Sequence, residues 1–412
     1  MSGSGKPILS PLMVFLSALI AFEFLCRLPY VLFILRTPET GQLVRQHFFA
    51  ASSPNSVIAL GLTLISAAWL ISCFAALASG FQYKAAGENA QGFPQISGAI
   101  YPIAALFFAA AIGAILSLGV DALIADISGK RAILRDHGST WIMLRLSVFC
   151  HVILCLFYIG ASQTGRRLDW LGFAIALILV ILPAIVFSAR AILISVILEV
   201  AYLQILMGQF RLRRGLRMLA IIVPVLLLIS VLRPQIVLMS FGETLLFGGE
   251  KILQSRYFFD FSKLGAVGLW AQEIPWLGPI SFGFLLEPFM GSQIIYYKEI
   301  GPMIAREVYF YRGVQGVTPG AFLEGYLSLG LLGGVLFFGL IVYGFLRLER
   351  HLFECRKTTL AGVLFPLLIL SKFSLLLNSS IGAFAFQTAT EAILLALILI
   401  PLRGYRARDQ LA

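Results

Sequence analysis

The chain has 412 residues, of which 59% are hydrophobic and only 12% are charged, and its mean hydropathy is +0.92. Soluble domains carry about 25% charged residues, so this composition excludes an ordinary cytosolic enzyme, a disordered chain and a small disulfide-rich secreted module. The formal net charge of +11 is explained in a membrane protein by basic residues that collect in cytoplasmic loops, and it does not indicate nucleic-acid binding.

Apolar runs long enough to cross a bilayer predict ten helical spans. The run from Leu171 to Gly208 is too long for one crossing, so we divide it at the polar turn Ser188-Ala189-Arg190. No small-residue cleavage site follows the first run, which we therefore expect to remain as a span. The predicted spans are 11–35, 56–80, 99–123, 141–162, 168–187, 189–209, 219–238, 320–346, 360–378 and 388–402.

Three basic segments set the predicted orientation, namely 211–217, 347–357 and 403–408. All three face the cytoplasm if both termini are cytoplasmic and ten spans lie between them. The predicted fold is thus an all-α, polytopic bundle in three parts. These are an N-terminal bundle of about seven spans (1–238), a long helical periplasmic loop (239–319), and a C-terminal bundle of about three spans with a basic tail (320–412).

The loop 239–319 is rich in aromatic residues and has no low-complexity sequence, which is typical of a functional loop. Two of its segments, 254–272 and 296–311, predict helices that lie along the membrane surface with one apolar face. Its aromatic rings fit either an interfacial belt or a groove in which rings stack on sugars. The predicted outer face also carries many basic residues, which hint at an anionic ligand although acidic neighbours will pair with some of them. They are Arg36, Arg45, Lys130, Arg131, Arg135, Arg190, Arg256, Lys263, Lys298, Arg306 and Arg312.

The segment from Arg306 to Gly334 carries the clearest motif, REVYFYRGVQGVTPGAFLEGYLSLGLLGG. Thr318 is a good N-cap and the following proline a good first residue, so the eighth span is predicted to begin here with its N-terminus facing outward. Such a terminus favours an anion, and Arg312 lies six residues before the cap. The glycines at 330 and 334 predict a face on which another helix packs closely.

Glu324 lies about two turns into this predicted span, where an ionised carboxylate is costly unless it faces protein or water. It is either a structural partner for an arginine, or a general base or sugar ligand.

An arginine, a glycine, a Thr-Pro pair and the step AFLEGY before a glycine-rich span resemble the Wzy-type O-antigen polymerases. The turn Ser188-Ala189-Arg190 is similar to an outward-facing Ser-x-Arg turn of these polymerases and of the related ligases. The resemblance is close only over 306–346 and this turn, and elsewhere it concerns span number and loop arrangement.

The resemblance implies a GT-C-like glycosyltransferase of the bacterial inner membrane with a periplasmic active site and no metal or other cofactor. Donor and acceptor would be undecaprenyl-pyrophosphate-linked oligosaccharides, and a separate co-polymerase would set chain length. Arg190, Arg256 and Arg312 would bind pyrophosphate, and Glu324 would orient or deprotonate the acceptor hydroxyl. The remaining substrate contacts would come from Tyr257, Arg233, Arg306, Thr318 and Tyr326.

Several ionisable residues lie elsewhere in the predicted spans. Glu23 and Arg27 are four residues apart on the first span and are expected to pair. Glu199, Lys372 and Glu391 are functional candidates because they lie within the membrane, but the sequence does not place them near one another. His151 is expected to be a buried structural residue.

Two other functions remain open. An O-antigen ligase would use similar substrates, but the histidine that this family has in its long outer loop is missing between Met239 and Val317. A lipid-linked oligosaccharide flippase or secondary transporter usually shows an inverted repeat, and no repeat is visible. The sequence has no Walker-type phosphate loop and no metal-binding motif, which argues against ATP-driven transport and a metalloenzyme.

Overall fold

A computed structural model of the chain describes residues 7–37, 48–49, 52–80, 82–84, 96, 98, 100–118, 149–186, 190–208, 253, 260–273, 301–310, 317, 319–354, 359–378 and 381–409. These residues are helical apart from turns and one pair of three-residue antiparallel strands, β1 (Pro7–Leu9) and β2 (Gln82–Lys84).

The helices of the N-terminal part follow the predicted spans closely. They are α1 (Pro11–Phe22), η1 (Glu23–Arg27), α2 (Leu28–Arg36), α4 (Pro54–Ser79), α5 (Ile100–Leu118), α9 (Cys150–Thr164), α10 (Arg167–Val186) and α11 (Arg190–Leu206). The C-terminal part contains α14 (Phe261–Glu273), η5 (Ile304–Val308), α17 (Gly320–Glu354), α18 (Leu360–Ser371), α19 (Phe373–Asn378) and α20 (Ile381–Asp409). The predicted span 219–238 lies outside the described residues.

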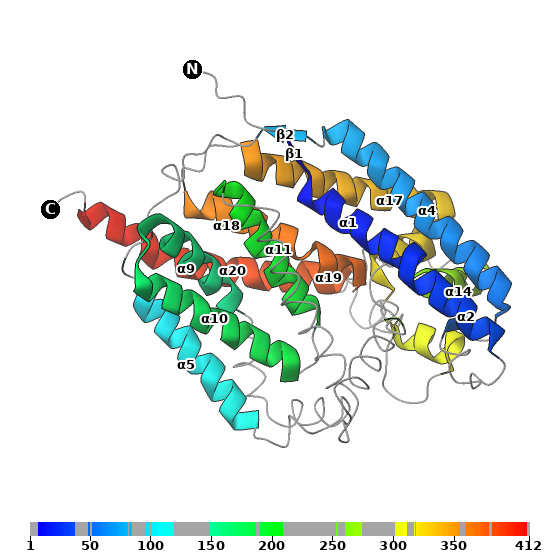
Figure 1. The fold of residues 1–412 in the computed structure, drawn as a ribbon, viewed down its shortest axis with the longest axis horizontal. Coiled ribbons are helices and arrows are strands. Elements are labelled where there is room, and N and C mark those ends of the chain that lie inside the picture. The colour runs from blue at the N-terminus through cyan, green and yellow to red at the C-terminus, as the bar shows by residue number, and fades with distance from the viewer. Residues whose placement is uncertain are drawn as a thin grey trace, which may run out of the picture.

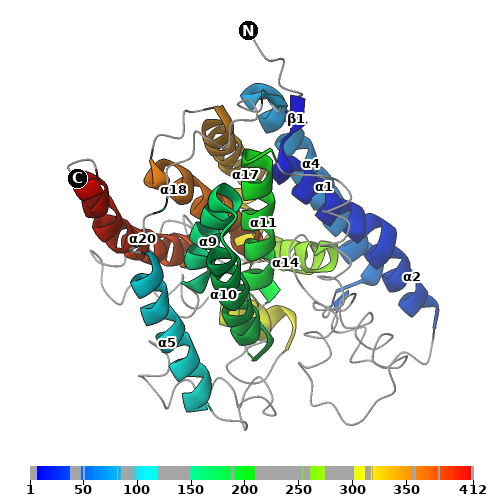
Figure 2. The ribbon, with the colours of Figure 1, turned by 60° about the vertical axis from the view of Figure 1, so that its left-hand side comes forward.

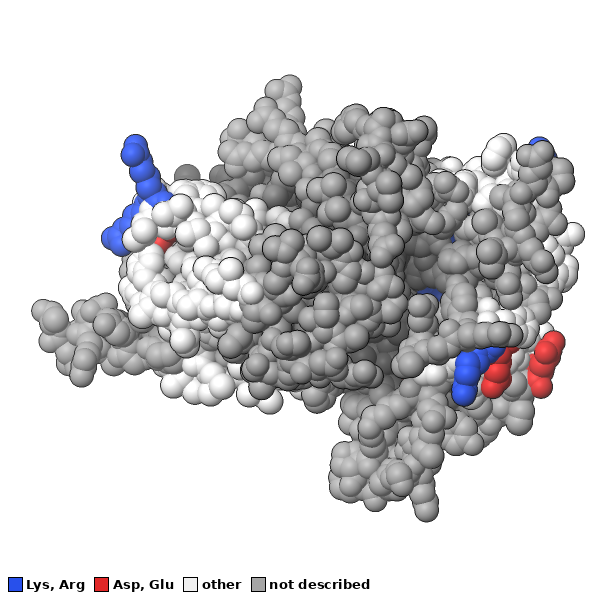
Figure 3. All heavy atoms as spheres, turned by 90° about the horizontal axis from the view of Figure 1, so that it is seen from below, with Lys and Arg blue, Asp and Glu red and all other residues white. Residues whose placement is uncertain are grey.

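The described helices form an elongated bundle with α1, α2 and α4 at one end and α5, α9 and α10 at the other (Figures 1 and 2). Four segments are long and apolar enough to cross a membrane: Pro11–Arg36, Pro54–Ser79, Gly320–Glu354 and Leu360–Asn378. Large apolar side chains such as Leu25, Leu106 and Leu332 are exposed on the surface. The described Lys, Arg, Asp and Glu side chains in view in Figure 3 lie mostly toward the two ends of that face. Long apolar helices with large apolar side chains exposed are typical of a membrane-embedded protein, so we describe the chain as one.

Polar contacts join the helix ends that the basic loops predict to be cytoplasmic. Arg350 on α17 donates to the backbone oxygen of Ser79 at the end of α4, at 2.9 Å. The buried carboxylate of Glu349 accepts hydrogen bonds from the hydroxyls of Ser10, before α1, and Tyr202, near the end of α11. These ends therefore lie on one side of the bundle, as the alternation of spans predicts.

Helix α17 is broken at Gly330, whose φ of 71° and ψ of −176° are not helical. The two parts of α17 fold back on each other, because a Cβ on Gly334 would lie 2.6 Å from the backbone nitrogen of Tyr326. In one straight helix these residues would be about 12 Å apart along the axis. The rings of Phe322 and Phe338 also meet, with centroids 5.5 Å apart. We call the segment 320–338 the Gly330 hairpin.

The prediction of one continuous eighth span over 320–346 is therefore wrong in its first part. The residues before Gly330 form a short helix that is entirely buried from Gly320 to Ser328, and the crossing helix begins after Gly330. The glycine face that was expected to receive another helix receives the chain's own preceding segment. The helix N-terminus at Gly320 also lies inside the bundle, since a Cβ there would meet the carbonyl oxygen of Leu377 at 2.3 Å. It does not face outward.

The predicted loop helix over 254–272 is confirmed in part by α14, but its location differs from the prediction. Every residue of α14 from Phe261 to Gly268 is buried, so the helix is enclosed by protein and does not lie along the membrane surface. Two glycines allow this: a Cβ on Gly61 of α4 would meet the carbonyl oxygen of Phe261 at 1.9 Å, and one on Gly265 would meet that of Val57 at 2.0 Å.

We predict that Gly330→Ala destabilises the protein by about 1–3 kcal/mol, because this combination of φ and ψ is open essentially only to glycine. Thermal unfolding of the detergent-solubilised protein measures the effect. Gly344→Ala is the matched control, since an added Cβ has no neighbour within 4 Å at either position and only Gly330 has a positive φ. Equal midpoints for the two variants would contradict the hairpin.

Candidate functional site

The first part of the candidate site is the N-terminus of α14, which is held by a buried group of charges that includes Glu23, Arg27 and Asp260. The Asp260 carboxylate caps the helix, accepting hydrogen bonds from the backbone nitrogens of Ser262 at 2.9 Å and Lys263 at 3.1 Å. Its other oxygen lies 2.8 Å from the guanidinium of Arg27, which also contacts Glu23 at 3.3 Å. The predicted pair of Glu23 and Arg27 is thus confirmed and belongs to a larger group.

The second part is Glu324 in the Gly330 hairpin, whose side chain is completely buried. Its Oε2 accepts a hydrogen bond of 2.7 Å from the backbone nitrogen of Ile381, the first residue of α20. Its Oε1 has no hydrogen-bond partner among the described residues. A helix N-terminus has unsatisfied N–H groups and a partial positive charge, so the carboxylate stabilises α20 with one oxygen and keeps the other for a further donor.

The hairpin and α14 are in direct contact. The Tyr326 hydroxyl lies 3.4 Å from the carbonyl oxygen of Gly268, and near the end of α14 the Trp270 indole donates to Glu307 of η5 at 3.2 Å. The short helix that carries Glu324 therefore packs against α14, and α14 in turn contacts η5. The sequence predicted that this part of the chain is functional, but did not predict that it enters the bundle.

The other predicted site residues differ in how far the structure describes them. Arg312, Arg256, Tyr257, Arg233 and Thr318 lie outside the described residues, and for Arg190 only its position as the first residue of α11 is described. Arg306 lies in η5 with an exposed side chain. Tyr326 is buried against α14. Glu324 and Tyr326 thus lie on one short helix but bind different neighbours, Ile381 of α20 and Gly268 of α14, and Arg306 lies on η5.

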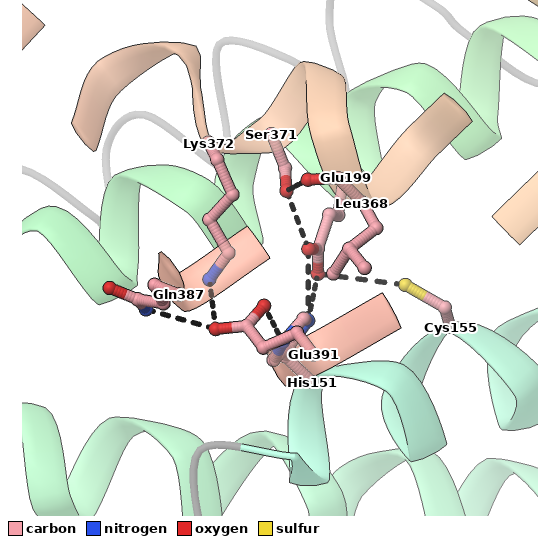
Figure 4. Close-up of polar contacts among 8 residues, drawn as sticks. All are labelled: His151, Cys155, Glu199, Leu368, Ser371, Lys372, Gln387 and Glu391. Carbon is pink, nitrogen blue, oxygen red and sulfur yellow. Dashed lines mark hydrogen bonds and ion pairs between the residues drawn. The ribbon is translucent and has the colours of Figure 1, made fainter. Parts of the chain in front are cut away.

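Two features escaped the sequence analysis. The role of Asp260 was missed, although an Asp followed by Phe-Ser-Lys is a normal N-cap pattern. The second feature is a cluster that joins His151, Glu199, Lys372 and Glu391 (Figure 4). We call it the buried quartet. These residues lie on separate helical segments, and a local sequence pattern does not predict contacts between such segments.

No protein-family model, curated protein or solved structure matches this chain. The functional assignment therefore rests on the residues and on their geometry.

We predict that Arg27→Gln destabilises the protein by about 3–5 kcal/mol, because it removes the guanidinium that lies between the carboxylates of Glu23 and Asp260. The measurement is thermal unfolding in detergent together with the yield of monodisperse protein. The control is Glu354→Gln, which breaks an exposed ion pair with Arg350 and is expected to cost less than about 1 kcal/mol. If both variants unfold like wild type, the buried group does not hold α14.

Proposed function

We propose that the protein is a membrane glycosyltransferase of the O-antigen polymerase type, acting on lipid-linked oligosaccharides at the periplasmic face of a bacterial inner membrane. The observation that carries the proposal is the environment of Glu324. A fully buried carboxylate is costly in a membrane protein, and here one of its oxygens has no described partner. Such a group is suited to accept a proton or hydrogen bond from a substrate hydroxyl.

In the proposed reaction the acceptor hydroxyl oxygen attacks the anomeric carbon of the donor glycan. The bond between that carbon and the pyrophosphate oxygen breaks, and undecaprenyl pyrophosphate leaves with the electron pair. Glu324 takes the hydroxyl proton through Oε1 while Ile381 holds Oε2 in place. The resemblance to the O-antigen polymerases assigns pyrophosphate binding to Arg190, Arg256 and Arg312. We propose that these arginines neutralise the leaving pyrophosphate.

An apolar groove next to this carboxylate supports a lipid-linked substrate. The groove has a volume of about 310 Å³ and runs between α17, α18, α19 and α20. It includes Ile381, whose backbone nitrogen binds Glu324, so its lining begins beside the candidate base. Its lining residues are Phe337, Leu340, Ile341, Gly344, Phe345, Leu348, Ile369, Leu376, Ile381 and Phe384. We propose that part of the isoprenoid chain lies there, with its pyrophosphate toward the outer end.

The second candidate function is secondary transport, which two observations favour. Transporters commonly contain interrupted helices near the middle of the membrane, and here α17 is broken at Gly330 and the span Leu360–Asn378 is divided into α18 and α19 at Lys372. They also contain intramembrane charges, as in the buried quartet. Deleting the gene of a flippase and deleting that of a polymerase would lead to the accumulation of different glycan intermediates.

We predict that Glu324→Gln reduces polymer formation by about 100-fold or more, while the protein reaches the membrane in normal amounts. The amide oxygen of glutamine still accepts the hydrogen bond from Ile381, so the fold is kept and only the negative charge is lost. The measurement is the size distribution of surface polysaccharide in a deletion strain that carries wild-type protein, Glu324→Gln or the surface variant Glu354→Gln.

Wild type and Glu354→Gln are expected to restore the ladder of surface glycans that differ in their number of repeat units. Glu324→Gln is expected to leave glycans with a single repeat unit. A full ladder with Glu324→Gln would remove this residue from the mechanism. Unpolymerised repeats that accumulate on the cytoplasmic face of the deletion strain would instead identify a flippase, and finished polymer that remains on the lipid carrier would identify a ligase.

A further inference from the structure

The buried quartet lies in the bundle away from the Glu324 site and takes no part in the proposed reaction. Each ring nitrogen of His151 lies near a different carboxylate: Nδ1 is 2.9 Å from Glu199 and is hydrogen-bonded to it, and Nε2 is 3.3 Å from Glu391, at ion-pair distance without a hydrogen bond. Lys372 contacts the second carboxylate at 3.0 Å. In Figure 4 the imidazole lies between the two acids, and all four side chains are at most 4% exposed.

The quartet joins four helical segments around a break in one of them. His151 lies on α9, Glu199 on α11 and Glu391 on α20, and Lys372 lies between α18 and α19. Neutral donors also bind both carboxylates. The Ser371 hydroxyl and the Cys155 thiol donate to Glu199 at 2.8 and 3.6 Å, and the Gln387 amide donates to Glu391 at 2.9 Å.

Charge balance then requires one further proton in the quartet, and His151 is the group to carry it because an imidazole is intrinsically more basic than a carboxylate. Two carboxylates and one ammonium leave a net charge of −1, and an imidazolium restores neutrality. A neutral imidazole would also point a lone pair at one of the two carboxylates, because it has only one N–H. An unbalanced charge is costly in a membrane interior, so both considerations favour the doubly protonated ring.

Among the residues that the structure describes, no other charge lies against the quartet. The only ionisable groups that face it from the described parts of the neighbouring helices are those already named, including the Cys155 thiol. Helix α5 contains no Asp, Glu, Lys, Arg or His, and Asp169 of α10 is bound to Tyr101 and Thr164 at the opposite end of α9. A cavity of about 10 Å³ beside His151 and Glu199 is at the lower limit for one water molecule, so solvent does little to stabilise a net charge.

We propose that the buried quartet is a proton-binding site, in which one proton carried by His151 neutralises the second carboxylate and fastens α9 and α11 to α20. The site shares α20 with the candidate active site, because Glu391 lies ten residues after Ile381, about 15 Å along the helix. The inference does not depend on the proposed polymerase activity, since it concerns a protonation state that exists without substrate.

The test is nuclear magnetic resonance of the full-length protein labelled with ¹⁵N-histidine, in nanodiscs at about pH 7.5, above the unperturbed pKa of histidine. The chain has four histidines, and His151→Gln assigns the signal of interest. The expected result is an imidazolium at His151, with both ring nitrogens protonated. A ring with a single N–H at His151 would overturn the proposal.

Two variants test whether charge balance is the cause. Glu391→Gln leaves Glu199 balanced by Lys372, so His151 is expected to lose its extra proton and become neutral. Gln387→Ala is the matched control, because it removes a hydrogen bond to the same carboxylate without changing any charge, and His151 should remain an imidazolium. If Glu391→Gln does not fold, Glu199→Gln carries the same expectation. An imidazolium that persists in the folded acid-to-amide variant would refute charge balance as the cause.

Discussion

The fold depends on one constraint, which is that helix N-termini inside a membrane bundle must find partners for their free N–H groups. Among the described residues near the candidate site, acidic side chains bind two such termini, those of α14 and α20. Each is bound by an acidic side chain, Asp260 in the first case and Glu324 in the second. Because a carboxylate in this setting also needs compensation, Asp260 is paired with Arg27.

Glu324 differs from Asp260 in that no described cation contacts it. Its second oxygen is buried and has no described partner, although the same residue is needed to satisfy α20. A group that served only as a cap could be replaced by a neutral residue such as asparagine or serine at lower cost. We therefore interpret the ionisable group as functional, and the adjacent apolar groove as the reason to expect a lipid-linked substrate.

Much of the fold was predictable because the hydrophobic effect acts through local sequence. The apolar runs predicted the positions of most helices to within a few residues. The basic loops predicted which helix ends lie on the same side of the bundle. The Gly330 hairpin was not predictable in this way, because both of its arms are apolar and helical. A hydropathy profile does not distinguish a continuous helix from two helices between which the chain reverses direction. The glycines at 330 and 334 were recognised as sites of close packing, but the sequence does not say which segment packs there.

For the candidate site, the sequence identified Glu324 because a carboxylate within an apolar segment is unusual. It did not identify Ile381 as the partner, since a backbone nitrogen has no sequence signature. The buried quartet was missed for a related reason: its members lie on separate helices, and their convergence depends on how α20 returns beside α9 and α11. Long-range contacts of this kind follow from tertiary packing rather than from local pattern.

The most direct test of the account is whether the Gly330 hairpin exists in the membrane. Cysteines placed at Phe322 and Phe338, in a background without the five native cysteines, should be joined by a short thiol cross-linker, because the two rings are 5.5 Å apart between centroids. A pair at Phe338 and Phe353, similarly spaced in the unbroken part of α17, should not react, since it spans about 22 Å of helix. Mass spectrometry of the cross-linked peptides reads the outcome. Failure of the first pair to cross-link would mean that α17 is continuous, and Glu324 would then not lie beside the start of α20.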